Sequence, residues 1–310
     1  MSCGDAPLPM AGGSVLTVGT FDGLHRGHQD VLARLVAQAA RESLPSLVVT
    51  FEPHPLQVVN PAAAPQLLTL HHEKLELFAQ SGVDYVVVLP FTPQLAGLEA
   101  AAFVDTVLLE RFSLRHLLVG HDHGFGRGRL GDSDVLRALG DSRGFRVTVL
   151  DPVQGAGGHP VSSTAIRRAI AGGDLDRAAA ARGRPYSVCG TVVRGDQRGR
   201  TLGFPTLNLS SVPAAKLLPP DGVYAVRVQL PEGEFGGMLN LGPRPTVGDP
   251  VRRIETHVFD ASGDWYGAPV RLDFVRYLRG VRPFAGLSAL QAQLSADAGA
   301  ARAALADRLS

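Results

Sequence analysis

Five short apolar runs in the first half of the chain, separated by segments of helical periodicity, constrain the fold more than any other feature. The apolar runs are residues 14–18, 47–51, 85–89, 117–119 and 146–150. Between them, helices are predicted over residues 28–41 and 99–111, and a third is expected to begin at a Thr69 cap. Strands that alternate with helices form a parallel sheet covered on both faces. We therefore predict a Rossmann-like α/β domain, in which ligands bind beyond the carboxyl ends of the strands.

The second half of the chain has a different pattern. Two short helices are predicted over residues 164–171 and 174–182, and residues 183–185 (Gly-Arg-Pro) then mark a boundary. Short β-rich runs separated by glycine and proline follow at residues 188–193, 222–230, 238–241, 255–259 and 270–277. This pattern favours an antiparallel β-barrel or sandwich, and the Ala- and Leu-rich tail from Leu287 predicts a C-terminal helix. We expect two domains, residues 1–182 and residues 183–310.

Composition narrows the class of protein. The chain has 310 residues, of which 45% are hydrophobic and 19% charged, as in ordinary globular proteins. A net charge of +1 indicates no basic surface for nucleic acid. Cys3 and Cys189 lie too far apart in the sequence to have the spacing of metal ligands. With no recognisable secretory leader and no apolar run long enough for a bilayer, we expect a cytoplasmic protein without nucleic-acid or membrane partners.

Residues 19–28 (GTFDGLHRGH) join the first predicted strand to the first predicted helix. Gly19, Gly23 and Gly27 leave room for a ligand close to the backbone, and the amides at a helix start point at a bound anion. His25 and His28 are three residues apart and can converge on one phosphate, where they would stabilise the charge that develops during phosphoryl transfer. The alternative is a glycine-rich turn with two incidental surface histidines.

A second candidate anion site lies at residues 162–167 (SSTAIR), where the helix after the last parallel strand is predicted to begin. The hydroxyls of Ser163 and Thr164 can cap this helix or bind phosphate oxygens. Arg167 in the first turn is unfavourable beside the positive end of the helix dipole, unless an anion lies there. The alternative is an N-cap followed by a solvated arginine.

The β-rich half contains its own glycine-rich pattern at residues 190–195 and 199–208, the latter reading GRTLGFPTLN. Its glycines can form a backbone cradle for phosphates. Thr206 and Asn208 are two residues apart, so on an extended segment they point the same way. Their oxygens, together with ATP phosphates and waters, make a candidate Mg²⁺ site. The alternative is a turn-rich hairpin with an outward polar face.

Four segments of the first half are similar, in order, to the adenylyltransferase half of bacterial bifunctional riboflavin kinase/FAD synthetases. They are residues 19–28, 51–55 (FEPHP), 119–126 (VGHDHGFG) and 162–167. The resemblance implies that an FMN phosphate oxygen attacks the α-phosphorus of ATP, giving FAD and pyrophosphate. It implies catalytic roles for His25, His28 and Arg167 and flavin contacts for Asp122 and Phe125. The ATP-binding residues that it implies are Gly19, Phe21, Asp22, Gly23, His25, His28, Ser163, Thr164 and Arg167.

His123 departs from the pattern of this family, in which an aromatic residue is common at the same place. Flavin stacking there is therefore expected to differ. His121 and His123 also suggest a metal pair, but two histidines alone do not make a site, and we favour substrate contact.

The second half resembles the riboflavin kinase domain of the same family over residues 199–208, 240–246 (NLGPRPT) and 254–260 (IETHVFD). The resemblance implies that Glu255 accepts the ribityl hydroxyl proton of riboflavin, a task that suits a carboxylate in a partly dry cleft. The alternative for Glu255 is an exposed strand carboxylate. Leu207 replaces the usual alanine and is expected to point away from the metal. The implied ligand residues are Gly195, Gly199, Arg200, Gly203, Thr206 and Asn208 for ATP, Thr206 and Asn208 for Mg²⁺, and Arg279 for flavin.

Together the two halves predict an enzyme that converts riboflavin to FMN with ATP and Mg²⁺ and then converts FMN to FAD. Three alternatives stay open: a single-activity relative with one decayed site, a non-catalytic flavin-binding or flavin-sensing protein, and a nucleotidyltransferase with another acceptor, such as a pantetheine phosphate. A usable residue at every motif position disfavours the first two alternatives. The kinase-like second half disfavours the third.

Overall fold

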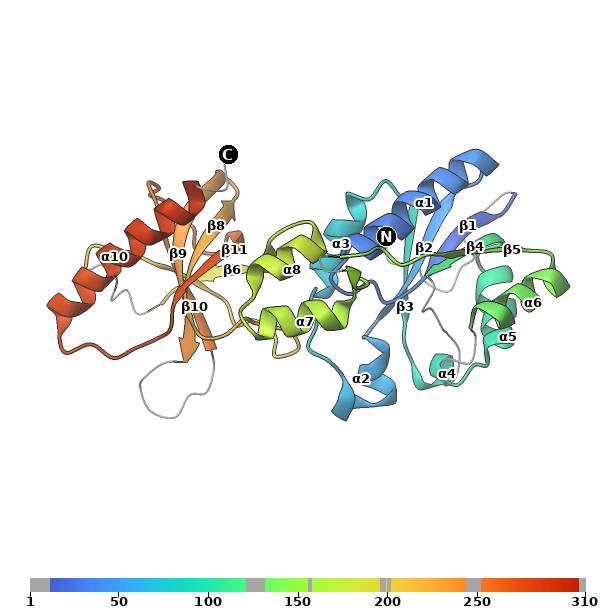
Figure 1. The fold of residues 1–310 in the computed structure, drawn as a ribbon, viewed down its shortest axis with the longest axis horizontal. Coiled ribbons are helices and arrows are strands. Elements are labelled where there is room, and N and C mark those ends of the chain that lie inside the picture. The colour runs from blue at the N-terminus through green and yellow to red at the C-terminus, as the bar shows by residue number, and fades with distance from the viewer. Residues whose placement is uncertain are drawn as a thin grey trace. The chain divides into compact units, whose positions relative to one another are not determined.

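The computed structural model describes residues 12–120, 132–155, 158–195, 199, 202–243 and 252–306. The chain divides into two compact units, Met1–Ser163 and Thr164–Ser310. The first contains a parallel sheet and the second an antiparallel barrel (Figure 1). The helices α7 (Ser163–Ala171) and α8 (Leu175–Arg182) lie between this division and the boundary predicted at residue 183. The placement of the domain boundary after these helices stays a prediction.

A five-stranded parallel sheet in the order β3-β2-β1-β4-β5 forms the centre of the first unit. Its strands are β1 (Ser14–Val18), β2 (Ser46–Glu52), β3 (Tyr85–Pro90), β4 (Leu114–Gly120) and β5 (Arg146–Leu150). Leu16 of β1 lies beside Leu47 of β2 and Leu117 of β4. All of β1 is buried, as expected for the middle of a sheet covered on both faces. The α/β prediction is confirmed, and the strand order reverses at β1, where sheets of this kind bind ligands.

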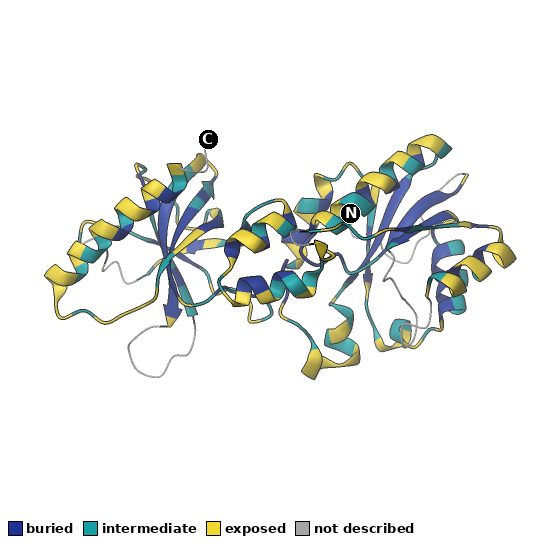
Figure 2. Ribbon diagram, in the orientation of Figure 1, coloured by how far each residue is buried: buried dark blue, intermediate teal, exposed yellow. Residues whose placement is uncertain are grey.

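Helices cover both faces of this sheet, and their outer turns are exposed (Figure 2). Leu32 and Leu35 of α1 share one core cluster with Phe78 of α3. Val104 and Leu108 of η2 belong to the other cluster, together with residues of α5 and α6. The helices are α1 (Arg26–Glu42), α2 (Pro55–Val59), η1 (Pro61–Ala63), α3 (His71–Ala79), α4 (Pro93–Ala96), α5 (Ala100–Phe103), η2 (Val104–Leu109) and α6 (Ser133–Arg143).

Three details of the first unit differ from the prediction. Thr69 does not cap α3; Leu70 is the N-cap residue, and the Thr69 hydroxyl is engaged by the loop after β1. The helix expected over residues 99–111 is divided into the four-residue α5 and the six-residue π-helical turn η2. The prediction missed α6 because it contains Gly140, a poor helix former. A Cβ at Gly140 would lie 2.6 Å from the Phe145 carbonyl oxygen, so close packing requires the glycine.

The second unit is built on a closed barrel in the order β10-β7-β6-β11-β8-β9, in which all neighbouring strands are antiparallel. The strands are β6 (Tyr186–Val193), β7 (Leu207–Leu209), β8 (Gly222–Leu230), β9 (Gly233–Pro243), β10 (Arg252–Val258) and β11 (Pro269–Arg279). Phe274 packs against Tyr186 and Tyr224, with ring centroids 6.3 and 5.1 Å apart. These three side chains are almost completely buried. The barrel prediction is confirmed.

The C-terminal helix α10 (Leu287–Ala306) packs against β8, β9 and β11. Ala301 and Ala304 share a buried cluster with Val223, Ala225 and Met238. Because Tyr224 alternates with Val223 and Ala225 and belongs to the interior, α10 covers the outer face of these strands. The predicted helical tail is confirmed.

Candidate active sites

The loop between β1 and α1 folds inward as a tight turn. The Gly19 amide donates to the Val49 carbonyl at 3.0 Å. Phe21, Gly23 and Leu24 have φ angles of 50°, 84° and 32°, and both Phe21 and Leu24 are buried. A left-handed conformation costs a non-glycine residue about 1–3 kcal/mol and persists only where the surroundings hold it. The loop is therefore fixed by its packing.

His25 and His28 lie together at the amino-terminal end of α1. His25 is the N-cap residue, and its Nδ1 accepts a hydrogen bond from the His28 amide at 3.3 Å. The two imidazole rings stack with centroids 3.7 Å apart, and the Phe21 ring meets His28 edge-on at 5.1 Å. A Cβ at Gly27 would lie 3.2 Å from the His25 ring, so the glycine permits this packing. Two imidazoles are thus brought together where the helix amides favour an anion.

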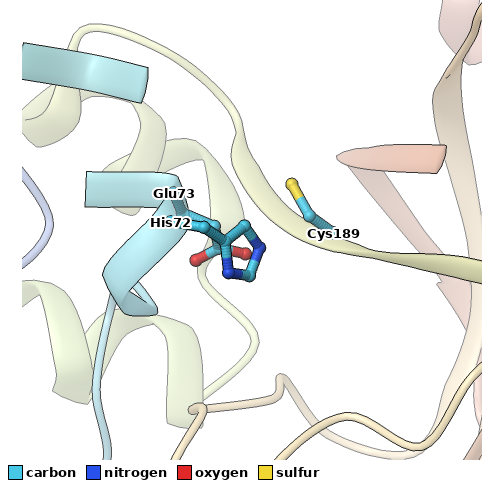
Figure 3. A group of neighbouring side chains, drawn as sticks. All are labelled: His72, Glu73 and Cys189. Atoms are coloured by element: carbon cyan, nitrogen blue, oxygen red, sulfur yellow. The ribbon is translucent and has the colours of Figure 1, made fainter. Parts of the chain in front are cut away.

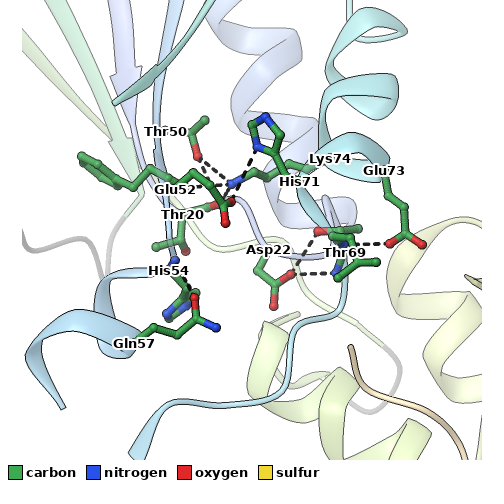
Figure 4. Close-up of polar contacts among 12 residues, drawn as sticks. Thr20, Asp22, Thr50, Glu52, His54, Gln57, Thr69, His71, Glu73 and Lys74 are labelled. Atoms are coloured by element: carbon green, nitrogen blue, oxygen red, sulfur yellow. Dashed lines mark hydrogen bonds and ion pairs between the residues drawn. The ribbon is translucent and has the colours of Figure 1, made fainter. Parts of the chain in front are cut away.

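Asp22 attaches the histidine loop to residues 68–69, which precede α3. Its carboxylate accepts hydrogen bonds from the Leu68 amide at 3.0 Å, the Thr69 amide at 2.9 Å and the Thr69 hydroxyl at 3.0 Å (Figure 4). The Thr69 hydroxyl in turn accepts from the Gly23 amide at 2.9 Å. The hydroxyl of Ser163 donates to the Asp22 carbonyl at 3.0 Å. These contacts give Asp22 and Ser163 roles in the loop structure, and their contacts with ATP stay predictions.

A pocket opens at the carboxyl ends of β1 and β2. It is lined by Thr20, Asp22, Phe51, Glu52, His54, Leu67, Thr69 and Lys74. Burial lowers the pKa of Lys74, while the charges of Glu52 and Asp22 act in the opposite direction. His71 lies 3.6 Å from the Glu52 carboxylate. The sequence analysis included residues 51–55 among the segments that resemble the adenylyltransferase half, but it missed Lys74. The signal that could have found Lys74 is its rarity, because only two of the 30 lysine and arginine residues are lysines.

Glu73, the neighbour of Lys74, has a structural role at the start of α3. Its carboxylate accepts a hydrogen bond from the Leu70 amide at 2.8 Å, which satisfies one of the amides that the first turn leaves without a helical partner. Figure 3 shows Glu73 beside His72 at this helix end.

The other residues predicted for adenylyl transfer are Thr164 and Arg167, at the start of α7, and Asp122 and Phe125. Thr164 and Arg167 fall in the second unit. Asp122 and Phe125 lie outside the described residues, as do His121 and His123. The roles of all four predicted site residues stay predictions.

The candidate kinase site is a row of polar residues across three neighbouring strands of the barrel. Glu255 of β10 pairs with Asn208 of β7 on one side and with Asn240 of β9 on the other. Directly opposed residues of antiparallel strands project from the same face, with Cβ atoms about 5 Å apart. Ile254 and Thr256 are buried on the alternate face, whereas Glu255 is half-buried. The register therefore brings the predicted base beside a predicted metal ligand. It adds Asn240, which lies in the matching segment 240–246 but had no predicted role in the site.

Close backbone approach explains two glycines of the predicted ATP cradle. A Cβ at Gly195 would lie 2.1 Å from Nδ2 of Asn208, and a Cβ at Gly199 would lie 2.2 Å from the Phe204 carbonyl oxygen. The Phe204 amide donates to the Gly199 carbonyl at 2.8 Å, which closes the turn. Gly203 in the same turn has a φ of 83°. Thr206 is half-buried in front of β7, and Arg200 lies outside the described residues.

Leu207 and Arg279 have packing roles in the barrel unit. Leu207 is 7% exposed and pairs with the buried Thr256, on the face opposite to Asn208. Nε of Arg279 donates to both carboxylate oxygens of Asp297 on α10, at 2.9 and 3.0 Å, and Nη2 donates at 2.6 Å. Asp297 is 4% exposed, so this ion pair joins β11 to α10. Flavin contact by Arg279 stays a prediction.

Two family models match the chain in order: FAD synthetase over residues 9–165 and riboflavin kinase over residues 182–305. Bifunctional riboflavin kinase/FMN adenylyltransferases from Pseudomonas fluorescens and Escherichia coli (strain K12) are 41% and 40% identical to it. The first match covers 94% of this chain and 93% of the relative, and the second covers 92% and 90%.

A crystal structure described as a macrolide-efflux protein from Streptococcus pneumoniae has a TM-score of 0.86 and 30% sequence identity, over 96% of each chain. In the part of the chain that the structure describes, no helix has the length and apolarity needed to cross a membrane. The two matched domains and the relatives that align over nearly the whole chain agree. The chain belongs to the family of bifunctional riboflavin kinase/FMN adenylyltransferases.

Proposed function

We propose that residues 183–310 phosphorylate riboflavin with ATP to give FMN, and that residues 1–182 adenylylate FMN to FAD with release of pyrophosphate. The observation that carries the adenylyl-transfer part of this proposal is the stacked pair of His25 and His28 at the amino-terminal end of α1. The positive end of the helix dipole and the N–H donors there stabilise the negative charge on a transferring phosphoryl group. Family membership supports the pair of reactions. We expect both to take place in the cytoplasm.

In adenylyl transfer, an FMN phosphate oxygen forms a bond to the α-phosphorus of ATP, and the bond from that phosphorus to the pyrophosphate oxygen breaks. Because Nδ1 of His25 accepts a backbone hydrogen bond, the ring proton lies on Nε2, which can donate to a phosphate oxygen. His28 supplies a second ring N–H beside it. Both stabilise the charge of the transition state without forming a covalent bond. Ser163, Thr164 and Arg167 hold the ATP phosphates in this proposal.

In the kinase reaction, the terminal ribityl hydroxyl of riboflavin attacks the γ-phosphorus of ATP, and ADP leaves. Glu255 accepts the hydroxyl proton as the new bond forms. Thr206 and Asn208 offer neutral oxygen donors of the kind that Mg²⁺ takes together with phosphates and water, and Asn208 lies in register with Glu255. Bound there, Mg²⁺ would offset the charge of the ATP phosphates.

The test is an incubation of the purified protein with riboflavin, ATP and Mg²⁺, followed by chromatographic separation of the flavins over time. FMN is expected to appear first and FAD to follow, and chelation of Mg²⁺ with EDTA should stop FMN formation. A protein that only binds or senses flavin would leave the riboflavin unchanged. The absence of both FMN and FAD would overturn the proposal.

A further inference from the structure

Lys74 of α3 is a buried cation that the mechanism above does not use. The residue is 6% exposed. Burying an ammonium group costs free energy unless oxygen atoms replace the water that it loses. Arginine supplies all but two of the 30 lysine and arginine residues of this chain, so lysine at this position is a marked exception. We therefore infer that this position requires a compact ammonium group.

Three oxygen atoms from two strand ends surround this ammonium group (Figure 4). Nζ of Lys74 lies 3.1 Å from the Phe51 carbonyl oxygen, 3.4 Å from the Thr50 hydroxyl and 3.5 Å from the Thr20 carbonyl oxygen. The Thr50 hydroxyl also donates to the Thr20 carbonyl, at 3.2 Å. Because Thr50 and Phe51 are among the last three residues of β2 and Thr20 lies in the loop after β1, these contacts fix the start of that loop to β2.

The histidines lie only a few residues beyond this attachment. Thr20 is followed by Phe21, which has the left-handed backbone and whose ring packs edge-on against His28. Asp22, the next residue, is held from the other side by the amides of Leu68 and Thr69. The backbone that seats Phe21 against His28 is thus attached at both ends. On the β2 side, Lys74 adds its contacts to the hydrogen bonds that the Gly19 amide and the Thr50 hydroxyl already make there.

We propose that Lys74 is a positioning residue for adenylyl transfer: its ammonium group fixes the loop that places His25 and His28, and it touches no reacting atom. The inference rests on the function proposed for these histidines. Three oxygens that converge on one nitrogen suit a compact ammonium with three donors, whereas the planar guanidinium fork of arginine is larger. This requirement accounts for a lysine in an arginine-rich chain.

The test is Lys74→Met, which keeps the apolar stem and removes the charge and its donors. With FMN supplied, kcat for FAD formation is expected to fall about 100-fold, the loss that a displacement of about 1 Å causes. KM for ATP and FMN should change less than about threefold, because the loss falls on the transition state. Riboflavin phosphorylation by the same sample should continue at the wild-type rate. A wild-type kcat for FAD formation would overturn the positioning role.

A combined variant shows whether Lys74 acts through the two histidines. Lys74→Met added to His25→Ala/His28→Ala should change the remaining kcat less than about threefold, because both groups that Lys74 positions are then absent. A kcat for FAD formation that falls by the product of the separate losses would overturn the proposal. Should Lys74→Met fail to fold, Thr50→Val removes the hydroxyl of the same cluster and is expected to lower kcat with unchanged KM; a wild-type kcat there would overturn it as well.

Two further variants complete the design. Arg34→Met removes an exposed cation of α1, which pairs with Asp30 at 2.8 Å, and should keep the wild-type kcat. His28→Ala separates the two claims. If it retains FAD synthesis, the proposed function of the histidines fails whatever Lys74→Met does. If it loses FAD synthesis while Lys74→Met retains it, only the positioning role fails.

Discussion

The two candidate sites are built from different parts of their folds. In the first unit, β1 is completely buried, so its polar groups lie in the loop beyond the strand end. In the barrel, Glu255 lies within β10 between the buried Ile254 and Thr256. A parallel sheet covered on both faces leaves no open strand face, whereas alternate residues of a barrel strand point outward. One fold therefore places reactive groups on loops, and the other can place them on strands.

This difference determines what holds each site in place. The histidine loop depends on individual buried contacts, namely those of Asp22 and Lys74. The kinase row depends on backbone pairing, which places Asn208, Glu255 and Asn240 side by side. We therefore expect substitutions of the supporting residues Asp22 and Lys74 to lower the activity of the first site. The second site should lose activity mainly when its own reactive residues are substituted.

The largest effect is expected at Glu255. Glu255→Gln removes the proton acceptor but keeps the size and pairing of the residue, so riboflavin phosphorylation should fall between about 100-fold and 10,000-fold. Conversion of supplied FMN to FAD should continue, as followed by chromatography. Glu234→Gln, at an exposed carboxylate of β9, is the control and should leave both rates unchanged. Equal losses of both activities in Glu255→Gln would contradict the assignment of adenylyl transfer to residues 1–182 and of riboflavin phosphorylation to residues 183–310.

His28→Ala is the matching change in the first unit. Loss of one donor to a transition-state oxyanion typically costs about 100-fold to 1,000-fold in kcat. FMN should accumulate from riboflavin while FAD formation falls by that factor. His72→Ala, at an exposed histidine of the same unit, is the control. Unchanged FAD synthesis in His28→Ala would contradict the role given to the stacked pair.

Asp22→Asn tests the hydrogen bonds that attach the histidine loop to Leu68 and Thr69. The amide group cannot accept all three hydrogen bonds of the carboxylate, and an unpaired buried N–H group costs about 1–3 kcal/mol. The free energy of unfolding of the first unit, measured with urea, should fall by that amount. Asp30→Asn on the surface of α1 should change it by less than about 0.5 kcal/mol. An Asp22→Asn protein as stable as the wild type would show that the loop does not need this attachment.

The smallest effect concerns a carboxylate away from both sites. Burial raises the pKa of Glu42, but hydrogen bonds from His116 and Gln38 and the charges of His116 and Arg146 outweigh it, so the pKa lies below its usual value. A group with a lowered folded-state pKa stabilises the protein above its unfolded pKa of about 4.5, and this contribution is lost as the pH falls through the folded value. Glu42→Gln should therefore lower stability at pH 7 and flatten its decline in acid, in thermal unfolding curves.

The barrel offers a contrasting carboxylate. Asp260 pairs with Arg302 at 2.6 Å, but its side chain is 75% exposed, compared with 10% for Glu42. Solvent-exposed ion pairs contribute little to stability. Asp260→Asn should leave the same unfolding curves unchanged. A larger loss of stability in Asp260→Asn than in Glu42→Gln would contradict the expectation that the buried ion pair contributes more than the exposed one.

The sequence predicted the parts of both sites that are local. His25 and His28 share a helix turn, and Thr206 and Asn208 share an extended segment, so spacing alone associates each pair. It missed Lys74 because the contact with Thr20 spans 54 positions. It gave Asn240 no role because that residue joins the row only through strand register. The fold class followed from strand and helix periodicity. The periodicity did not predict α6, in which Gly140 is a poor helix former, or the division of residues 99–111 into α5 and η2.

The most direct test of the account is a mixture of the two catalytic variants. Glu255→Gln should convert FMN but not riboflavin, and His28→Ala should make FMN but not FAD. Mixed in equal amounts with riboflavin, ATP and Mg²⁺, the two proteins should together produce FAD, because each provides one complete site and FMN can pass between them. If each variant keeps its remaining reaction but the mixture forms no FAD, the two sites do not work independently and the account is contradicted.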